Sequence, residues 1–335
     1  MKYKTHLILP YGEVRNGILT VEDDIHFEER DVKAEFIASS SFFNAHIHLG
    51  DSHIRDPPHM DIEELVGPGG FKFQNLRYDE NAVTSIKNSI DIALSSGTSV
   101  LADFREGGIE GLDILRRADV NRMCCPFARP SSLEEAEILA QDEYVRGFGM
   151  SSTRDHEPEF LEEVRRIARV SGKLFGIHAG ERDEEDVDDA INLKPDFLVH
   201  MNKAKNDQIR FVMDEEIPII SCLRSNAFFG FLNLNNYRML SEYDRWMIGT
   251  DNVMISSPSI LNELKFACYL LRKDLKVFQA AIRGFDFFGF KPALIVFHKR
   301  GNLRDSLNPV ASVVRRAEKE DIELIKWVDY SQFIS

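Results

Sequence analysis

The sequence predicts an α/β protein: a (β/α)8 barrel with a small composite β domain built from both termini. Through the middle of the chain, short apolar runs alternate with amphipathic helical patterns, which is typical of a parallel sheet. Eight such runs are present, enough to close a barrel. The length of 335 residues suits a barrel of about 250 residues with an accessory part. Alternating apolar and polar residues at both ends predict the small sheet.

The eight predicted barrel strands are short, and four of them end at a histidine or an aspartate. In order they are Ser41–His48, Ser99–Phe104, Arg122–Ala128, Val145–Met150, Lys173–His178, Phe197–His200, Ile217–Leu223 and Arg245–Asp251. The helices between them include Ala82–Ser95, Gly111–Ala118, Pro158–Ser171 and Asp207–Glu215. Functional sites of such barrels lie at the carboxyl ends of the strands, so these polar residues are the candidates for chemistry.

The terminal segments read as a separate small sheet. Within residues 1–41, Thr5–Leu9 and Gly17–Val21 alternate like strands, and we expect an antiparallel pair joined by a turn at Asn16-Gly17. Ala293–Phe297 and Ile322–Val328 show similar patterns. We therefore expect residues 1–41 and 291–335 to form the small domain, and residues 42–290 to form the barrel.

Composition argues against several classes of protein. The net charge of −14 repels phosphate backbones, so nucleic-acid binding is not expected. No apolar run approaches the length of about 18 residues that a membrane span needs, and Leu7-Ile8-Leu9 is too short for the core of a signal peptide. The four cysteines form neither a C-x-x-C pair nor a disulfide framework. We expect a cytoplasmic protein with Cys124 and Cys125 as buried thiols; homo-oligomerisation stays open.

Histidines and one aspartate at strand ends predict a metal site. His46 and His48 alternate along the first strand, so both imidazoles face the same side. Such a pair alone is also compatible with half-buried histidines, but His178 and Asp251 end two other predicted strands. Three imidazoles and one carboxylate suit Zn²⁺ or Fe²⁺ and leave a position for water. Water bound there would be largely hydroxide near neutral pH.

Three residues are candidates for proton transfer. Glu181 lies three residues after His178, where a carboxylate can reach both water and substrate. His200 could orient the hydroxide, serve as a ligand or be a core histidine, and Asp251 could combine the roles of ligand and base. Glu181 also opens an acidic run, which we expect to be the solvated start of a helix: Asp183, Glu184, Glu185, Asp186, Asp188 and Asp189.

Two segments are candidates for contact with a substrate. The strand that ends near Cys222 leads into Arg224, Ser225 and Asn226, for which substrate contact and a structural role are both open. Lys72 and Gln74 lie in the long loop from residue 57 to residue 76. Loops of that length often form a lid or a wall of a site.

As an ordered set, these motifs resemble the amidohydrolase superfamily. Within it they are similar to the branch of cytosine, guanine and adenosine-type deaminases and triazine chlorohydrolases. The resemblance is carried by Asn44–Gly50 (Asn-Ala-His-Ile-His-Leu-Gly), His178–Glu181 (His-Ala-Gly-Glu), Val199-His200, Cys222–Asn226 (Cys-Leu-Arg-Ser-Asn), Gly249–Asn252 (Gly-Thr-Asp-Asn) and Asn308–Ala317.

The resemblance implies a role for each of these residues. His46, His48, His178 and Asp251 match the family's metal ligands, Glu181 its proton shuttle and His200 the residue that orients the hydroxide. The family's metal-bridging lysine on the fourth strand has no counterpart in residues 145–151, which implies one metal ion. Two departures leave the substrate open: Leu223 replaces the family's proline, and the connection between His178 and His200 is short.

The expected function is that of a mononuclear metal-dependent hydrolase. We expect an aminohydrolase that deaminates a nitrogen heterocycle through metal-bound hydroxide; the substrate would be a nucleobase or nucleoside such as an adenosine derivative, guanine or cytosine. The expected cofactor is one divalent ion, Zn²⁺, with Fe²⁺ as the alternative. Hydrolysis of a cyclic amide or of a chlorinated heterocycle would use the same residues, and a non-catalytic metal-containing binding protein is the alternative from another class.

Overall fold

The computed structural model describes residues 1–327 of the chain, which divides into two compact units. Among the described residues, the smaller unit comprises 1–44, 93–100 and 259–327, and the larger comprises 45–92 and 101–258. The domain boundaries expected from the sequence, after residues 41 and 290, stay a prediction.

A six-stranded sheet in the smaller unit joins both ends of the chain. Its strand order is β15-β14-β4-β1-β2-β3. The bounds are β1 Lys2–Ile8, β2 Val14–Val21, β3 Ile25–Glu29, β4 Phe36–Ser40, β14 Leu294–His298 and β15 Ile322–Lys326. Strand β4 pairs in parallel with β1 and antiparallel with β14, so the composite sheet predicted from both termini is confirmed. Val328, the last residue of the strand predicted at 322–328, lies outside the described residues.

The turn between β1 and β2 is not where the sequence predicted it. Asn16 and Gly17 lie inside β2, opposite His6 and Thr5 of β1. The chain reverses at residues 9–13, where Gly12 adopts a φ of 94°. Glycine is needed at position 17 for another reason: a Cβ there would lie 2.2 Å from the backbone oxygen of Glu28 in β3. The expected Asn-Gly turn was therefore wrong, because this glycine permits a close approach of two strands.

Eight parallel strands form the barrel, and the eighth is divided into two short elements, β12 and β13. The bounds are β5 Phe42–His48, β6 Thr98–Arg105, β7 Cys124–Ala128, β8 Gly147–Met150, β9 Leu174–Ala179, β10 Phe197–His200, β11 Ile219–Ser221, β12 Trp246–Ile248 and β13 Asp251–Asn252. They follow one another in sequence order from β5 to β12, while β13 pairs with β5. Each predicted strand is present, within a few residues of the expected bounds.

The last strand closes the barrel at the Gly249-Thr250 step between β12 and β13. The Gly249 nitrogen donates to the oxygen of Ser221 in β11 at 3.0 Å, and the Thr250 nitrogen donates to the oxygen of His46 in β5 at 2.9 Å. The eighth barrel strand is thus hydrogen-bonded to β11 on one side and to β5 on the other. A Cβ on Gly249 would lie 2.6 Å from the backbone of His46, so glycine permits the close approach of the first and last strands.

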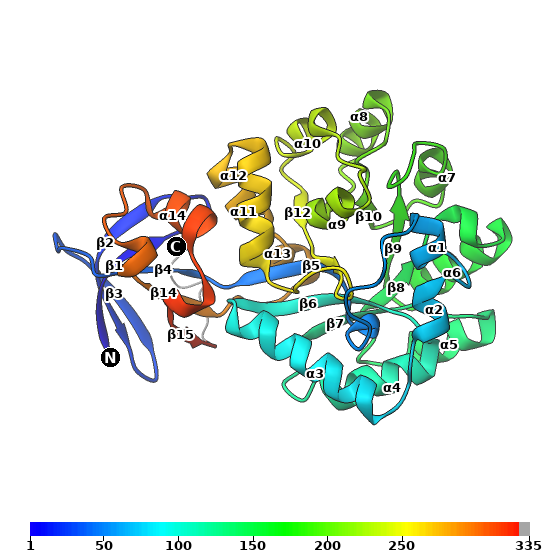
Figure 1. Ribbon diagram of the computed structural model, residues 1–335, viewed down its shortest axis with the longest axis horizontal. Coiled ribbons are helices and arrows are strands. Elements are labelled where there is room, and N and C mark those ends of the chain that lie inside the picture. Colours follow the sequence, from blue (N-terminus) through cyan, green and yellow to red (C-terminus); the bar gives the residue numbers. More distant parts are fainter. Residues whose placement is uncertain (328–335) are drawn as a thin grey trace. The chain divides into compact units, whose positions relative to one another are not determined.

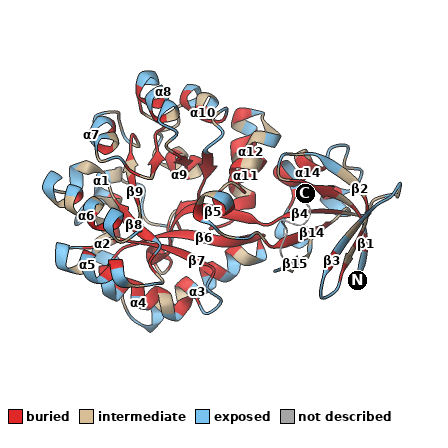
Figure 2. Cartoon of the chain, turned by 180° about the vertical axis from the view of Figure 1, so that it is seen from behind, coloured by how far each residue is buried: buried red, intermediate tan, exposed pale blue. Residues whose placement is uncertain are grey.

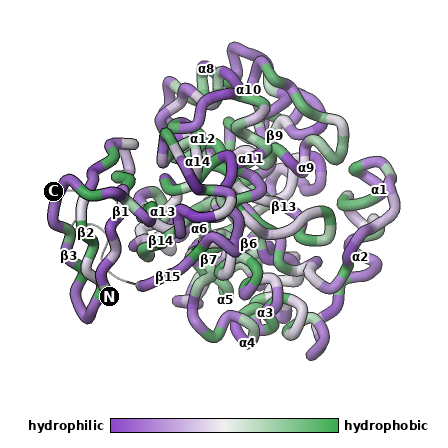
Figure 3. The backbone as a smooth tube through the Cα atoms, turned by 60° about the vertical axis from the view of Figure 1, so that its left-hand side comes forward, coloured by the Kyte–Doolittle hydropathy of each residue, from purple (hydrophilic) through white to green (hydrophobic). Residues whose placement is uncertain are grey.

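Amphipathic helices surround the strands of the larger unit. In Figure 1, helices α3 to α6 lie around strands β6 to β8, and Figure 2 shows buried strands and helices exposed on their outer faces. Figure 3 shows hydrophobic and hydrophilic residues alternating along these helices. The bounds are α3 Glu80–Ser95, α4 Gly108–Ala118, α5 Leu133–Gln141, α6 Pro158–Val170, α7 Val187–Asn192, α8 Asn206–Asp214, α9 Leu223–Phe228 and α10 Leu234–Leu240.

The long segment after β5 carries two short helices, α1 (Ile62–Val66) and α2 (Phe71–Asn75). An apolar cluster of Ile54, Leu65 and Met254 anchors this segment to the chain that follows β13.

Further helices are α11 Ile260–Leu271, α12 Asp274–Ala280, α13 Gly284–Phe288 and α14 Pro309–Arg316. Among the described residues, no helix has both the length and the apolar character required to cross a bilayer.

Candidate metal centre and active site

The candidate metal ligands lie at the carboxyl ends of four barrel strands. His46 and His48 are in the last three positions of β5, His178 is the penultimate residue of β9, His200 ends β10 and Asp251 begins β13. Two of them have backbone conformations that are uncommon outside glycine, with φ of 79° at His200 and 61° at Asp251. The surrounding fold must hold these conformations in place, as is common at functional sites.

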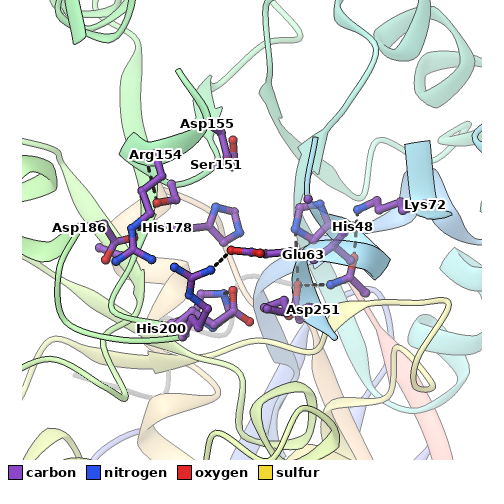
Figure 4. Close-up of a pocket in the computed structure, with 18 of the residues that line it drawn as sticks. His48, Glu63, Lys72, Ser151, Arg154, Asp155, His178, Asp186, His200 and Asp251 are labelled. Atoms are coloured by element: carbon purple, nitrogen blue, oxygen red, sulfur yellow. Dashed lines mark hydrogen bonds and ion pairs between the residues drawn. The ribbon is translucent and has the colours of Figure 1, made fainter. Parts of the chain in front are cut away.

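The side chains form one cluster, in which His178 is half-buried and the other candidate ligands are buried. Figure 4 shows His48, His178, His200 and Asp251 around the cavity. Asp251 Oδ1 lies 3.4 Å from Nε2 of His46 and 3.4 Å from Nε2 of His48. The Nε2 atoms of His46 and His178 are 3.2 Å apart. His200 is close by, with its ring centre 5.3 Å from that of His178. The structure therefore brings together all four residues that the sequence proposed as ligands.

These spacings fit the donor set of a divalent ion. With metal–ligand bonds of about 2.1 Å, two ligands of a tetrahedral site lie about 3.4 Å apart. The Nδ1 atom of His48 faces only acceptors, Phe104 O at 3.2 Å and Glu106 Oε1 at 2.6 Å. The Nδ1 atom of His178 faces Met150 O at 2.7 Å. Both Nδ1 atoms must carry the hydrogen, which leaves each Nε2 lone pair free to bind a metal.

The histidines are held in the neutral form that metal binding requires. Burial lowers the pKa of His46 and, more strongly, that of His178. Burial also lowers the pKa of His48 to about 4, helped by the charge of Lys72, and that of His200 to about 4. Burial opposes ionisation of Asp251, but its hydrogen bond to His46 and the nearby imidazoles hold its pKa well below the usual value. Neutral imidazoles and an ionised carboxylate face each other.

Close groups of donor atoms include two residues beyond the four predicted ligands. The ligand atoms of His46, His48 and Asp251 lie within 4.8 Å of one another, as do those of His46, His178 and His200. His200, Cys222 and Asp251 form a third such group. Nε2 of His200 is buried and makes no hydrogen bond with any described residue. Since buried polar atoms are normally hydrogen-bonded, this nitrogen fits a position beside a small polar ligand.

Glu181 faces His200 across the cavity. Its Oε2 lies 3.3 Å from Nε2 of His200, and its Oε1 accepts a hydrogen bond of 3.4 Å from Nδ2 of Asn226. Burial raises the pKa of Glu181 well above its usual value, and the carboxylates of Asp251 and Asp186 raise it further. The protonated acid is thus favoured at this position.

Ser225 and Asn226 contact the site residues themselves. Ser225 Oγ donates to Asp251 Oδ2 at 2.5 Å, and Asn226 lies 3.3 Å from Nδ1 of His200. The hydroxyl of Tyr237 donates to Asn226 at 2.8 Å and fixes the amide. Arg224 donates instead to the backbone oxygen of Ser257 at 2.8 Å. Ser225 and Asn226 thus orient Asp251, His200 and Glu181, and the substrate contacts predicted for residues 224–226 stay a prediction.

The acidic run after Glu181 is only partly the solvated surface that the sequence predicted. Helix α7 begins inside the run, with Asp188 and Asp189 in its first turn. Asp186, however, is buried: its Oδ1 accepts from the Gly180 nitrogen at 2.8 Å and its Oδ2 from Ser152 Oγ at 2.7 Å. Gly180 adopts a φ of 62°. Asp186 therefore holds the tight turn between His178 and Glu181, and the expectation of solvent exposure was wrong for this residue.

A buried ionic network behind His48 was not foreseen. Glu106 Oε1, 2.6 Å from Nδ1 of His48, is also 2.5 Å from Nζ of Lys72. Nζ of Lys72 donates to Asn252 Oδ1 at 3.0 Å and lies 3.6 Å from Asp51 Oδ2. A carboxylate on the outer nitrogen of a metal-binding histidine fixes the ring and its tautomer. The sequence indicated Lys72 as a candidate for pocket contact. It did not indicate Glu106, whose only distinguishing feature in the sequence is that it directly follows β6.

The cluster borders a cavity of about 160 Å³, shown in Figure 4. Lys72 lies on the side of His48, and Arg154 and Asp186 lie on the side of His178. Lys72 is part of the lining, whereas Gln74, the other candidate of that loop, is exposed. The metal-side cavity, as we call it, gives a small molecule access to the candidate ligands.

Comparison with known proteins shows the family of the chain. The profile of the Amidohydrolase family matches residues 37–290. A protein of Archaeoglobus fulgidus whose given name proposes an aminohydrolase is 43% identical over 327 residues, covering 97% of each chain.

Solved structures share the fold at low sequence identity. Guanine deaminase from C. acetobutylicum, with guanine bound in its active site, is similar with a TM-score of 0.78 at 12% identity, over 97% of each chain. An adenosine deaminase from Xanthomonas campestris with bound zinc has a TM-score of 0.77 at 12% identity, over 97% of this chain and 91% of that one. The family profile covers more than half of the sequence, and the close relative covers nearly all of it. The chain belongs to the amidohydrolase family.

Proposed function

We propose that this protein is an aminohydrolase that deaminates a nitrogen heterocycle, a nucleobase or a nucleoside, with one divalent cation. The observation that carries the proposal is the grouping of three imidazoles and Asp251 at neighbouring strand ends, beside the half-buried carboxyl of Glu181. The deaminases with the same fold support the choice of substrate class, since they act on guanine and adenosine.

His46, His48, His178 and Asp251 would hold the ion, and Zn²⁺ suits three nitrogens and one oxygen. When bound, the ion lowers the pKa of a water molecule and so supplies a nucleophile near neutral pH. Barrel strand β8 ends without a lysine, and its carbonyl at Met150 receives the Nδ1 hydrogen of His178. These features support a site for one ion.

The residues of the chain move the protons. The carboxyl of Glu181 donates a proton to a ring nitrogen, which makes the adjacent aminated carbon more electrophilic. Asp251 or His200 accepts the proton that the attacking water loses. That proton passes to the amino group, the bond between carbon and nitrogen breaks, and ammonia leaves. The oxygen stays on the ring carbon as a carbonyl, and its remaining proton returns to the carboxylate of Glu181, which restores the acid. Asn226 holds Glu181 and His200 in place for both transfers.

The test is ammonia release from a panel of aminated bases and nucleosides, with the metal content of the protein measured alongside. We expect turnover of at least one compound, loss of that turnover after chelation and recovery with Zn²⁺, while circular dichroism shows that the chelated protein stays folded. If no heterocycle releases ammonia at any metal loading, the deaminase proposal fails. Release of chloride or ring opening of a cyclic amide would assign the same site to another hydrolysis.

A further inference from the structure

A second cavity adjoins the metal-side cavity. It has a volume of about 490 Å³, and no candidate metal ligand lines it. Both cavities are lined by the same five residues where they meet: Val66, Phe73, Arg129, Ser151 and Asp155. Sites for small molecules usually measure about 300–1,000 Å³. The metal-side cavity alone is smaller than this, so the second cavity offers space for a part of the substrate beyond the reacting ring.

Arg129 stands at the boundary of the two cavities. It follows directly after β7, where its backbone nitrogen donates to Arg105 O at 2.9 Å and its Nε donates to Gly149 O at 3.2 Å. These bonds fix the stem of a half-buried side chain. The remaining guanidinium nitrogens are free to bind a ligand from either cavity.

Arg129 differs from the other cations around the cavities in its lack of a carboxylate partner. Arg154 donates to Asp183 at 3.0 Å, Arg182 pairs with Glu63, and Lys72 pairs with Glu106.

No carboxylate within residues 1–327 forms an ion pair with Arg129. Asp155 borders both cavities, but it is exposed to solvent, where its charge is well screened. The charge of Arg129 lowers the pKa of buried Glu106, but that carboxylate is already bonded to Lys72 and His48. A half-buried guanidinium without a directly paired carboxylate gains from a ligand that supplies one.

Neutral hydrogen-bonding groups lie next to Arg129. Ser151 Oγ, which lines both cavities, is 2.9 Å from Nε2 of His156 in the second cavity. Burial lowers the pKa of His156, and the charge of Arg129 lowers it further. A hydroxyl and a neutral imidazole beside a guanidinium form a set of donors suited to a carboxylate or a phosphate, which arginine binds through two parallel hydrogen bonds.

We infer that the substrate carries an anionic group, a carboxylate or a phosphate, on the part of the molecule away from the aminated ring carbon, and that Arg129 binds this group where the two cavities meet. The inference rests on the proposed function, because the reacting ring must occupy the metal-side cavity for its substituent to reach Arg129. Free bases and uncharged nucleosides are then poorer substrates than nucleosides with an acidic substituent.

The experiment compares matched compounds on the metal-loaded protein: adenine, adenosine, adenosine 5′-monophosphate and adenosine 5′-carboxylate, with the corresponding cytosine series. We expect kcat/KM for an anionic compound to exceed that of its neutral parent at least about tenfold, mainly through KM. The phosphate and carboxylate arms show which anion is preferred. In Arg129→Met the ratio of anionic to neutral kcat/KM falls towards one. Arg129→Lys keeps the charge but loses the paired donors, so its ratio of anionic to neutral kcat/KM should lie between those of the wild type and Arg129→Met.

A binding measurement gives a readout apart from turnover. Calorimetry with the deaminated products inosine and inosine 5′-monophosphate should show tighter binding of the phosphate to the wild type, and loss of that preference in Arg129→Met. The control is Arg166→Met, which removes an exposed arginine of α6 paired with Glu163 and should keep the preference.

The outcomes separate the two proposals. If no compound releases ammonia, the proposed function fails. If neutral compounds react as well as the anionic ones, or the preference survives in both Arg129 variants, the assignment of Arg129 is overturned while the deaminase proposal stands.

Discussion

Replacement of Lys72 by methionine tests the buried ionic network behind the metal site. The lysine Nζ lies 2.5 Å from Glu106 Oε1, and the exposed fractions of the two side chains are 3% and 1%. Burial raises the pKa of nearby Asp51 to about 8 even though Lys72 opposes this, so Asp51 is largely protonated at pH 7. Lys72 and Glu106 are therefore the charges that compensate each other.

Methionine keeps the length of the side chain but leaves the carboxylate of Glu106 buried without the cation that is bonded to it. Removal of one partner of a buried pair costs about 3–5 kcal/mol, so the free energy of unfolding of Lys72→Met should fall by about that amount. The measurement is urea denaturation followed by tryptophan fluorescence, since Trp246 is fully buried in the barrel. The double variant Lys72→Met/Glu106→Gln should recover part of the loss, because glutamine removes the uncompensated charge.

The control is Lys205→Met, whose lysine lies 3.8 Å from Glu184 on the surface, with exposed fractions of 60% and 42%. Exposed pairs of this kind contribute at most about 1 kcal/mol. The reasoning is refuted if Lys72→Met is no less stable than this control, or if the effects of the Lys72 and Glu106 substitutions simply add. Additive losses would mean that the two groups do not interact in the folded protein.

Three further predictions concern catalysis, acid stability and thiol chemistry. Glu181→Gln should lower kcat at least about 10²-fold with unchanged metal content, whereas Glu184→Gln in the exposed part of the acidic run should leave kcat unchanged; equal activity of the two variants would remove Glu181 from the mechanism. Hydrogen bonds from Arg154 hold the pKa of Asp183 well below its ordinary value of 3.8. The ion pair therefore adds to the free energy of unfolding above pH 4, and this stabilisation is lost as the pH falls. Denaturation midpoints of Arg154→Met and wild type should accordingly differ at pH 6 and converge in acid; a difference that persists in acid contradicts this linkage. All four cysteines are buried thiols outside any disulfide, and burial raises the pKa of Cys268 to about 12. A thiol reagent should therefore label none of them within minutes in the native protein and all four after unfolding. Fast labelling of the native protein would show that a thiol is accessible.

The candidate ligands could be predicted because they depend on topology alone. Each one ends an apolar run, and a parallel barrel brings all strand ends to one rim whatever the loops do. His178 and His46 are 132 positions apart in the chain, yet their strand positions sufficed to place them together. The same logic located Glu181, which follows its strand by only two residues.

Contacts made by loops could not be predicted in this way. Lys72 lies in α2, which follows a segment without a periodic pattern, so only the tertiary structure shows that it meets Glu106. Arg129 directly follows its strand, but its lack of a carboxylate partner depends on where Asp155, Asp183 and Glu63 lie in space. Two-residue patterns were also ambiguous: Asn16-Gly17 is typical of a hairpin turn, and only the approach of a third strand explains why glycine is there.

The order of apolar runs and their polar ends determined the barrel, the composite sheet and the set of residues that could bind a metal, because strand periodicity is a local property of the chain. The tertiary structure alone decided which charges are paired, which nitrogen of each histidine faces the centre and where a second cavity opens. These features depend on distances between segments far apart in sequence, and side-chain packing sets those distances.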